Sequence, residues 1–219
     1  MTRGQKLLRR SEADSNRVQF DPVPHSAAFS LIELLATVLI ILVLTTMYWS
    51  GNSTNRQRSR QAACQQNLQK IFIAMQIYAN EYKERFPEKP GARTSEEALD
   101  ALVPKYTSDT AVFICPGSKD AELPGGESFL KRRISYAYYM GRRTGDTTEV
   151  LMSDRQVDTN SKAPNQPVFS ATGKPPGNNH KQLGGNFLFC DGHVELSPPS
   201  SAFSLVLTQG VVLLNPKPQ

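Results

Sequence analysis

Several thiol, imidazole and carboxylate side chains in the second half of the chain have the chemistry of metal ligands or of a nucleophilic site. The chemically adequate metal ligands are Asp154, His180, Asp191 and His193. Their spacing matches no established metal motif, so no cofactor is expected and a bound metal ion stays the alternative. Cys190, beside Asp191 and near His193, would allow a thiol nucleophile and an anchored hydrolase. A cysteine in the apolar run NFLFC is more often buried and inert.

The sequence excludes several common function classes. It contains no Gly-x-Ser-x-Gly elbow, no Walker-type phosphate loop and no His-Glu-x-x-His. The expectation is therefore that the protein is not an enzyme. The formal net charge is +5, but the basic residues lie in short groups without interleaved aromatic residues. Specific binding of nucleic acid is not expected from that pattern.

One carboxylate, Glu33, lies inside the most apolar stretch of the chain. Residues 29–49 read FSLIELLATVLIILVLTTMYW, and as a helix they would be about 31 Å long, matching a bilayer core of about 30 Å. A carboxylate in the hydrocarbon region costs a few kcal/mol, so it indicates a function and needs a partner. A cut between Ala28 and Phe29 would create an amine within reach of Glu33, in the same or a neighbouring subunit.

The segment FSLIELLATVLIILVL resembles the N-terminal class III signal segment of type IV pilins and type II secretion pseudopilins. The resemblance implies that a prepilin peptidase cuts after Ala28 and methylates the amine of Phe29, and that Glu33 guides assembly. Ala28 departs from the family pattern, which has Gly before the cut. Further segments resemble a bacterial prepilin-like subfamily named for a His, nine residues and Asp-Gly: CQQNLQKIFIAMQIYANEYKERFP, FICPGS, SYAYYMG and NFLFCDGHVEL. In this chain ten residues separate His180 from Asp191-Gly192.

The same resemblance implies a structural subunit of a type IV pilus or a type II secretion pseudopilus. Its partners would be the prepilin peptidase, other pilin or pseudopilin subunits and an inner-membrane assembly platform. The protein would cross the bacterial inner membrane once, with its head periplasmic or extracellular. The basic leader favours this N-in orientation, although Arg56, Arg58 and Arg60 reduce the charge difference across the span. The alternative is a singly anchored periplasmic protein that binds a ligand or metal ion and does not polymerise.

The elements that must position these residues follow from periodicity, which predicts an α+β protein. The resemblance implies that this fold is of the pilin-like lollipop type. Residues 1–28 would be a cytoplasmic leader, 29–50 the transmembrane and assembly helix, 51–87 its amphipathic half, and 88–219 a soluble α+β head. Apolar residues of the amphipathic half recur at spacings of three and four: Leu68, Ile71, Met75, Tyr78 and Tyr82. That face is expected to pack on a small antiparallel sheet. Gly51 and Asn52 are expected to loosen the helix where it leaves the membrane.

The head is expected to contain one further short helix and several strands. Thr94-Ser-Glu-Glu97 predicts a capping box for the helix, which would end before Pro104. Period-two alternation predicts strands over residues 111–115, 134–140, 150–153 and 186–196. Asp191-Gly192 predicts a type I′ hairpin turn. Residues 154–185 predict a long surface loop, and the short apolar C-terminal segments predict either an edge hairpin or a helix and a strand.

Three cysteines, Cys64, Cys115 and Cys190, are too few for a disulfide scaffold and lack the Cys-x-x-Cys spacing of a metal site. In an oxidising compartment, Cys64 with Cys115 is the preferred disulfide pair. Three reduced, buried thiols are the alternative.

Overall fold

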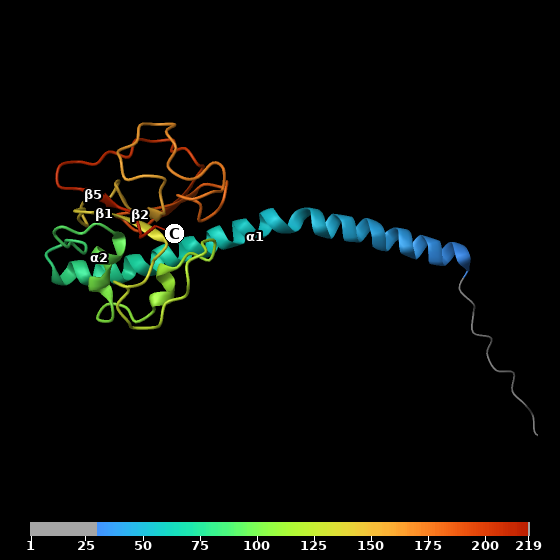
Figure 1. Ribbon diagram of the computed structural model, residues 1–219, viewed down its shortest axis with the longest axis horizontal. Helices are drawn as coiled ribbons and strands as arrows, with labels where there is room; N and C mark the ends of the chain where they lie inside the picture. The colour runs from blue at the N-terminus through green and yellow to red at the C-terminus, as the bar shows by residue number, and fades with distance from the viewer. Residues whose placement is uncertain (1–29, 219) are drawn as a thin grey trace, which may run out of the picture. The chain divides into compact units, whose positions relative to one another are not determined.

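One long helix and a small five-stranded antiparallel sheet make the protein an α+β fold, as the sequence predicts (Figure 1). The computed structural model describes residues 30–218, without the side chains of residues 49–53. The leader, with Ala28 and Phe29, lies outside the described residues. The chain divides into two compact units, Met1–Met47 and Tyr48–Gln219.

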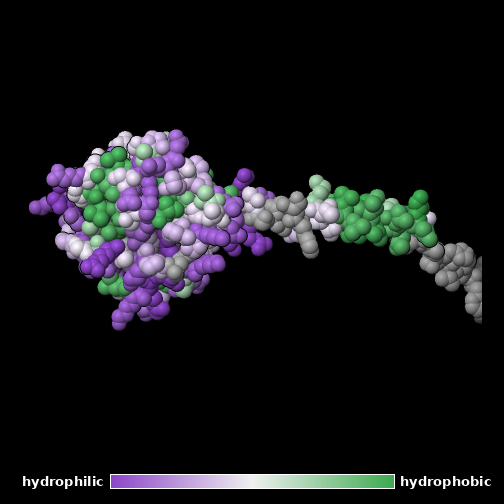
Figure 2. All heavy atoms as spheres, turned by 45° about the horizontal axis from the view of Figure 1, so that its top comes forward, coloured by the Kyte–Doolittle hydropathy of each residue, from purple (hydrophilic) through white to green (hydrophobic). Residues whose placement is uncertain are grey.

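The N-terminal part of helix α1 (Leu31–Glu81) has an apolar and uncovered surface. The 18 residues from Leu31 to Tyr48 are apolar enough to cross a membrane, and none of them is buried. Figure 2 shows this apolar surface in green. The helix continues through Gly51 and Asn52, where the sequence predicted a looser backbone. That prediction was wrong because Gly costs a helix interior only about 1 kcal/mol and no Pro is present to break the hydrogen-bond ladder.

The C-terminal part of α1 buries the stripe that the sequence predicted. Leu68, Ile71 and Met75 are fully buried, and Cys64 lies on the same face. Tyr82 was predicted to belong to this stripe but is 47% exposed. The helix ends at Glu81, so the ring of Tyr82 stacks on Tyr78, with 4.1 Å between ring centroids, instead of entering the core.

The sheet follows the order β4-β3-β2-β1-β5, and every neighbouring pair of strands is antiparallel. The strands are β1 (Tyr136–Met140), β2 (Val150–Asp154), β3 (Gly185–Phe189), β4 (Val194–Ser197) and β5 (Val212–Leu214). The three central strands are buried along their whole length. Burial on both faces explains this, because a half-exposed strand would alternate.

Each face of the sheet has its own hydrophobic core. One face packs on α1 and on the short helix α2 (Ser95–Leu99). The other face is covered by the connections that follow β2 and β4, drawn in orange and red in Figure 1. Residues 154–185 were predicted to be a surface loop, and this was wrong in part: Val168 and Phe169 are buried, and the ring of Phe169 packs 5.3 Å from that of Phe187. Two large apolar side chains in a Pro- and Gly-rich segment are the sign of that burial.

Residues 111–115 do not form the predicted strand. Thr110–Phe113 is a 3-10 helix, and Val112 and Phe113 are both buried. A strand would send these neighbouring side chains to opposite faces. The segment is linked to the sheet by a hydrogen bond from Ser135 N to Phe113 O, at 2.9 Å.

The hairpin between β3 and β4 forms where Asp191-Gly192 predicts it, but its turn is not type I′. Phe189 N donates to His193 O at 3.0 Å, so the loop has three residues, Cys190 to Gly192. Only Gly192 of these has positive φ, at +93°. Asp191 keeps negative φ because its carboxylate accepts the N–H of His193, at 3.0 Å, and so closes the turn through its side chain.

Two further predictions were corrected at the ends of elements. Thr94 caps α2 without a side-chain hydrogen bond, and Glu97 accepts the N–H of Arg93 at 2.9 Å, so the capping box is shifted by one residue. At the C-terminus β5 pairs with β1, while the preceding apolar segment makes an isolated bridge between Leu205 and Lys162. Neither the edge hairpin nor the helix-and-strand alternative describes this arrangement.

Candidate functional site

A disulfide between Cys64 and Cys115 joins α1 to the segment that follows the 3-10 helix. Their Cα atoms are 5.3 Å apart, and both residues are buried. This is the pair that the sequence analysis preferred. Beside it, Asn67 Nδ2 donates to Ile114 O at 3.1 Å, so α1 holds this segment through both a covalent and a polar contact.

A buried contact between a histidine and a carboxylate lies against the disulfide. His180 Nε2 is 3.2 Å from Asp154 Oδ2 and 3.4 Å from Cys115 Sγ. Neither the Asp154 nor the His180 residue is exposed. Asp154 comes from the end of β2 and His180 from the long connection that follows it. The fold thus brings together two of the four predicted metal ligands.

The Asp154 carboxylate is held by three amide N–H groups. Asn186 donates to Oδ2 from its backbone N, at 2.8 Å, and from Nδ2, at 2.9 Å. Asn179 Nδ2 donates to Oδ1 at 2.9 Å and to the carbonyl of Ser135 at 2.8 Å. Both oxygens of the carboxylate are therefore hydrogen-bonded, and the network fixes the orientation of the Asp154 side chain inside the head.

Gly117 makes room for the imidazole of His180. A Cβ at position 117 would lie 2.7 Å from His180 Nδ1 and closer still to the backbone O of Asn179, and both distances are shorter than any ordinary contact. The backbone N–H of Gly117 also points at Cys115 Sγ, at 3.3 Å. Among the described residues, His180 Nδ1 has no hydrogen-bond partner.

The other two predicted ligands, Asp191 and His193, lie apart from this cluster in the exposed hairpin turn. His193 Nδ1 is 2.5 Å from Asp191 Oδ1, and the imidazole stacks on Phe189. Partial burial would raise the pKa of Asp191, but the hydrogen bonds from His193 outweigh it and lower that pKa. The four candidate ligands do not form a single site. Asp191 and His193 belong to the exposed hairpin turn, whereas Asp154 and His180 lie in the core.

The two cysteines of the disulfide complete a buried group that sequence reasoning missed. One ligand atom from each of Cys64, Cys115, Asp154 and His180 lies within 4.8 Å of the others. We call these four residues the buried cluster. Their positions in the chain form no motif, so only the fold brings them together. The weak signal was that Asp154, His180 and one cysteine of the preferred disulfide pair, Cys115, all lay in the predicted head, residues 88–219.

Cys190 is not an activated nucleophile. The residue is 1% exposed, and burial raises the pKa of its thiol to about 12. A thiol with that pKa is protonated at neutral pH and is a poor nucleophile. His193, its potential base, is already hydrogen-bonded to Asp191.

Glu33 lies in the first turn of α1 and is exposed. It is the one charged residue between Leu31 and Tyr48. Its position, one turn into an apolar helix, is the position that the sequence analysis assigned to an assembly carboxylate. Ala28 and Phe29, the predicted processing site, precede the described residues.

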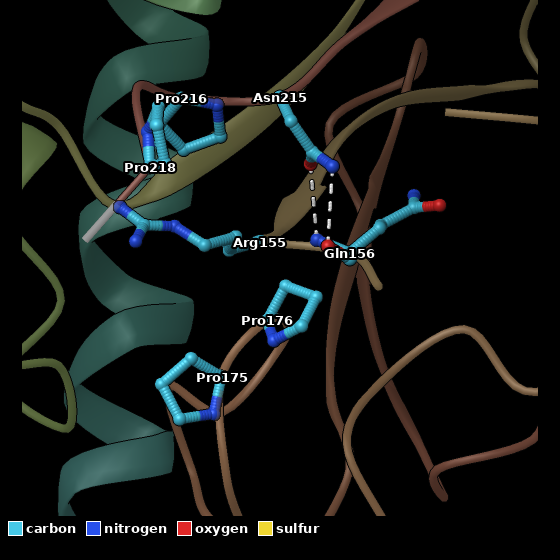
Figure 3. A pocket seen from close by; sticks show the side chains of 7 residues that line it. All are labelled: Arg155, Gln156, Pro175, Pro176, Asn215, Pro216 and Pro218. Carbon is cyan, nitrogen blue, oxygen red and sulfur yellow. Dashed lines mark hydrogen bonds between the residues drawn. The ribbon is translucent and has the colours of Figure 1, made fainter. Parts of the chain in front are cut away.

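A proline-lined pocket of about 410 Å³ lies elsewhere in the head. Figure 3 shows the side chain of Arg155 with Pro175 and Pro176 on one side and Pro216 and Pro218 on the other. Arg155 Nη2 donates to Asp120 Oδ2, at 3.2 Å, and to Ile134 O, at 2.9 Å. Its Nε and Nη1 atoms are buried and have no partner among the described residues.

At the rim of this pocket, the side-chain amide of Asn215 makes two hydrogen bonds to the backbone of Gln156, as a residue of a neighbouring strand would do. Asn215 Oδ1 accepts the N–H of Gln156, and Asn215 Nδ2 donates to the Gln156 carbonyl, both at 3.1 Å (Figure 3). The pocket is therefore a built feature of the head and not a gap between loose segments.

No protein-family model, curated protein or solved structure matches this chain. Three features of the chain itself bear on its function. These are the carboxylate in the apolar part of α1, the buried cluster and the proline-lined pocket.

Proposed function

We propose that the chain is a prepilin-like structural subunit that is anchored by α1 and assembles through this helix into a filament of the type IV pilus or type II secretion class. The observation that carries the proposal is the placement of Glu33 in the first turn of an uncovered apolar helix. The resemblance of residues 29–44 to a class III signal segment supports the same function.

The surface of the apolar segment needs a covering that the head does not provide. Leu31 is 80% exposed and Met47 is 72% exposed, at the two ends of the segment. Soluble proteins rarely expose an apolar patch of this size, and a lipid bilayer or a bundle of like helices covers one. In either setting the helix is away from water.

The polar groups of the segment fit such a dry environment. The hydroxyls of three threonines each donate to the carbonyl three residues earlier, at 2.8 to 2.9 Å: Thr37, Thr45 and Thr46. Glu33 cannot bond in the same way, because an ionised carboxylate has no proton to donate to a carbonyl. A carboxylate inside the hydrocarbon region of a membrane costs a few kcal/mol, so a cationic partner would stabilise Glu33.

The proposed partner is the amine that cleavage before Phe29 creates, on the same or on a neighbouring subunit. Pairing between subunits would fix the axial register of packed helices, because only one register neutralises both charges. The head would then be displayed on the periplasmic or extracellular side. Prepilin peptidase, like subunits and an inner-membrane platform are the partners in this proposal.

Mass spectrometry of the N-terminus tests the processing step. The full chain would be expressed in bacterial membranes with and without a prepilin peptidase. The expected result is a peptidase-dependent start at Phe29 with an N-methyl group. A chain that begins near Met1 under both conditions would contradict the proposal and leave the helix as a plain anchor.

A pair of matched variants tests assembly. Glu33→Leu removes the charge, while Thr37→Leu, four residues on, makes a similar apolar change on the same side of the helix. We expect both variants to be processed, and Glu33→Leu alone to lower the yield of cross-linked or sheared polymer by about tenfold, as loss of about 1.4 kcal/mol per contact would do. Equal polymer yields from wild type and Glu33→Leu would contradict the proposed role of Glu33.

The proline-lined pocket favours a second candidate function, a singly anchored protein that binds a small anionic ligand in its head. Arg155 is 3% exposed, and a guanidinium with free N–H donors beside apolar walls suits a carboxylate ligand. For such a protein Glu33→Leu would be neutral or would improve insertion. Chemical shift changes at Gln156 and Asn215 on titration with a panel of small carboxylates, absent in Arg155→Leu, would support it.

A further inference from the structure

The buried cluster has the composition of a site for a thiophilic metal ion. It offers two sulfur atoms, one imidazole nitrogen and one carboxylate oxygen, all buried. Sulfur and nitrogen ligands of this kind select zinc-like ions over calcium or magnesium. In the structure the two sulfur atoms are joined in the Cys64–Cys115 disulfide and so are not available as thiolates.

Two of the distances in the cluster suit tetrahedral coordination. In a tetrahedral zinc site, with metal–ligand distances of about 2.0 to 2.3 Å, the ligand atoms lie about 3.3 to 3.8 Å from one another. His180 Nε2 is 3.2 Å from Asp154 Oδ2 and 3.4 Å from Cys115 Sγ. The two sulfur atoms are closer together than this spacing because a covalent bond joins them, and all four ligand atoms lie within 4.8 Å of one another.

We propose that reduction of the Cys64–Cys115 disulfide converts the buried cluster into a tetrahedral site for Zn²⁺ or a similar divalent ion. A dithiol reductant supplies two electrons and two protons: the S–S bond breaks, two thiols form, and the reductant becomes a disulfide. The metal ion then binds both sulfur atoms as thiolates and releases the two thiol protons to solvent. Oxidation of the site by a disulfide-forming oxidant reverses the sequence and expels the ion.

The remaining two ligands need only a tautomeric change. In the disulfide form, His180 Nε2 faces Asp154 Oδ2, and the tautomer with its proton on Nε2 donates to that oxygen. In the metal form the neutral imidazole carries its proton on Nδ1, and the ion occupies the position between Nε2 and Oδ2. No net charge moves onto the histidine in this exchange.

The surroundings of Asp154 are those of an oriented metal ligand. Asn186 donates two hydrogen bonds to Oδ2, and Asn179 donates one to Oδ1. Outer hydrogen bonds of this kind fix the direction of a ligating carboxylate in metal sites. The exposed pair Asp191 and His193 lacks such support, because its members are bonded to each other and face solvent.

The inference is independent of filament assembly, because every residue involved lies in the head unit. The reduced head would bind the ion, and oxidation to the disulfide would release it. Occupancy by the ion would therefore report the redox state of the head.

Cobalt titration tests the site directly. The full chain in detergent micelles would be reduced with a phosphine under anaerobic conditions and titrated with Co²⁺. We expect one equivalent to bind, with a thiolate-to-cobalt charge-transfer band and the intense visible bands of tetrahedral Co²⁺, and Zn²⁺ to displace it. The oxidised chain, its own control, should show neither band.

Matched variants assign the ligands. Cys190→Ser, which removes the free thiol outside the cluster, and His193→Ala should leave the spectrum unchanged. Cys115→Ser should abolish the charge-transfer intensity of one thiolate, and His180→Gln should weaken binding by at least about tenfold. A reduced wild type without the charge-transfer band, or a band that depends on Cys190, would overturn the proposal.

Circular dichroism covers the case in which reduction loosens the head. If the reduced chain loses native signal, addition of Co²⁺ or Zn²⁺ should restore it, because a site that exists only in the folded chain couples binding to folding. Failure of either ion to restore the signal would also overturn the proposal.

Discussion

The imidazole of His180 lies 3.2 Å from the carboxylate of Asp154, and both side chains are fully withdrawn from solvent. This contact joins the long connection after β2 to the end of the strand from which the connection departs. Burying polar groups such as these costs free energy unless each of them is paired. The connection after β2 therefore keeps its position only while the hydrogen bonds around Asp154 and His180 are intact. Two predictions concern that network.

Asp154→Asn should destabilise the head by about 3 kcal/mol. The substitution removes the negative charge and turns an NH₂ group toward N–H donors of Asn179 or Asn186, which then lose their acceptor. The measurement is urea unfolding of the full chain in micelles, followed by the circular dichroism of the sheet.

Asp191→Asn is the matched control for that experiment. Asp191 is also paired with a histidine, but its side chain is 42% exposed, and exposed pairs contribute at most about 1 kcal/mol. If Asp191→Asn cost as much as Asp154→Asn, burial would not be the reason for the sensitivity of Asp154.

Gly117→Ala should displace His180. The added Cβ would meet Nδ1 of the His180 ring at 2.7 Å and the backbone O of Asn179 at a still shorter distance, so both residues must shift, and the ring would move relative to Asp154. We expect a loss of about 1–3 kcal/mol, as for other overpacked sites, and a changed NMR signal of the His180 ring. Gly145→Ala, where a Cβ meets nothing within 4 Å, should change neither quantity. An unperturbed His180 signal in Gly117→Ala would refute the tight contact.

The elements that were predicted correctly are those whose sequence signals come from residues a few positions apart in the chain. The spacing of Leu68, Ile71 and Met75 is fixed by 3.6 residues per turn, and it identifies the buried face of α1 without knowledge of what covers it. The hairpin at Asp191-Gly192 is local in the same sense. Its turn type was not predictable from the dipeptide, because the Asp191 side chain supplied the turn hydrogen bond that a backbone with positive φ would otherwise provide.

The buried cluster could not be predicted, because its residues lie far apart in the sequence. Its four members come from α1, from the segment after the 3-10 helix, from β2 and from the connection after it, so their proximity is a property of the tertiary fold alone. The sequence analysis grouped His180 with Asp191 by the chemistry of their side chains and by the resemblance to the His-x9-Asp-Gly subfamily. In the structure His180 lies in the core, and Asp191 lies in an exposed turn.

Reduction of the Cys64–Cys115 disulfide should lower the free energy of unfolding by about 4 kcal/mol, because the bond closes a loop of 51 residues in the unfolded chain. The measurement compares urea midpoints of oxidised and reduced protein in the presence of a chelator. Cys190→Ser serves as the parent for both forms, since it removes the thiol that could exchange with the disulfide. A difference below about 1 kcal/mol would show that the bond does not constrain the unfolded chain.

Alkaline pH should unfold the head in step with ionisation of its buried tyrosines. Burial raises the pKa of Tyr139 to about 12 and raises that of Tyr138 well above its usual range. The folded chain therefore holds the phenol protons more tightly than the unfolded chain, in which tyrosine has a pKa of about 10. The stabilisation is fully present below about pH 10 and is lost as pH rises toward the folded pKa, at about 1.4 kcal/mol per pH unit for each such tyrosine.

Tyr139→Phe isolates one of these groups. Tyr138 donates its hydroxyl proton to Pro87 O, at 2.7 Å, and stays in place, so the variant should reduce the slope of stability against pH between about 10 and 12 by the contribution of one tyrosine, about 1.4 kcal/mol per unit. Tyrosinate absorbance and circular dichroism, recorded together against pH, give the test. In the wild type the absorbance of the buried phenolates should rise only as the sheet signal falls. Full tyrosinate absorbance with an intact sheet signal would mean that solvent reaches these hydroxyls in the folded head, and the core between α1 and the sheet would then be far less closely packed than the burial of Tyr138 requires.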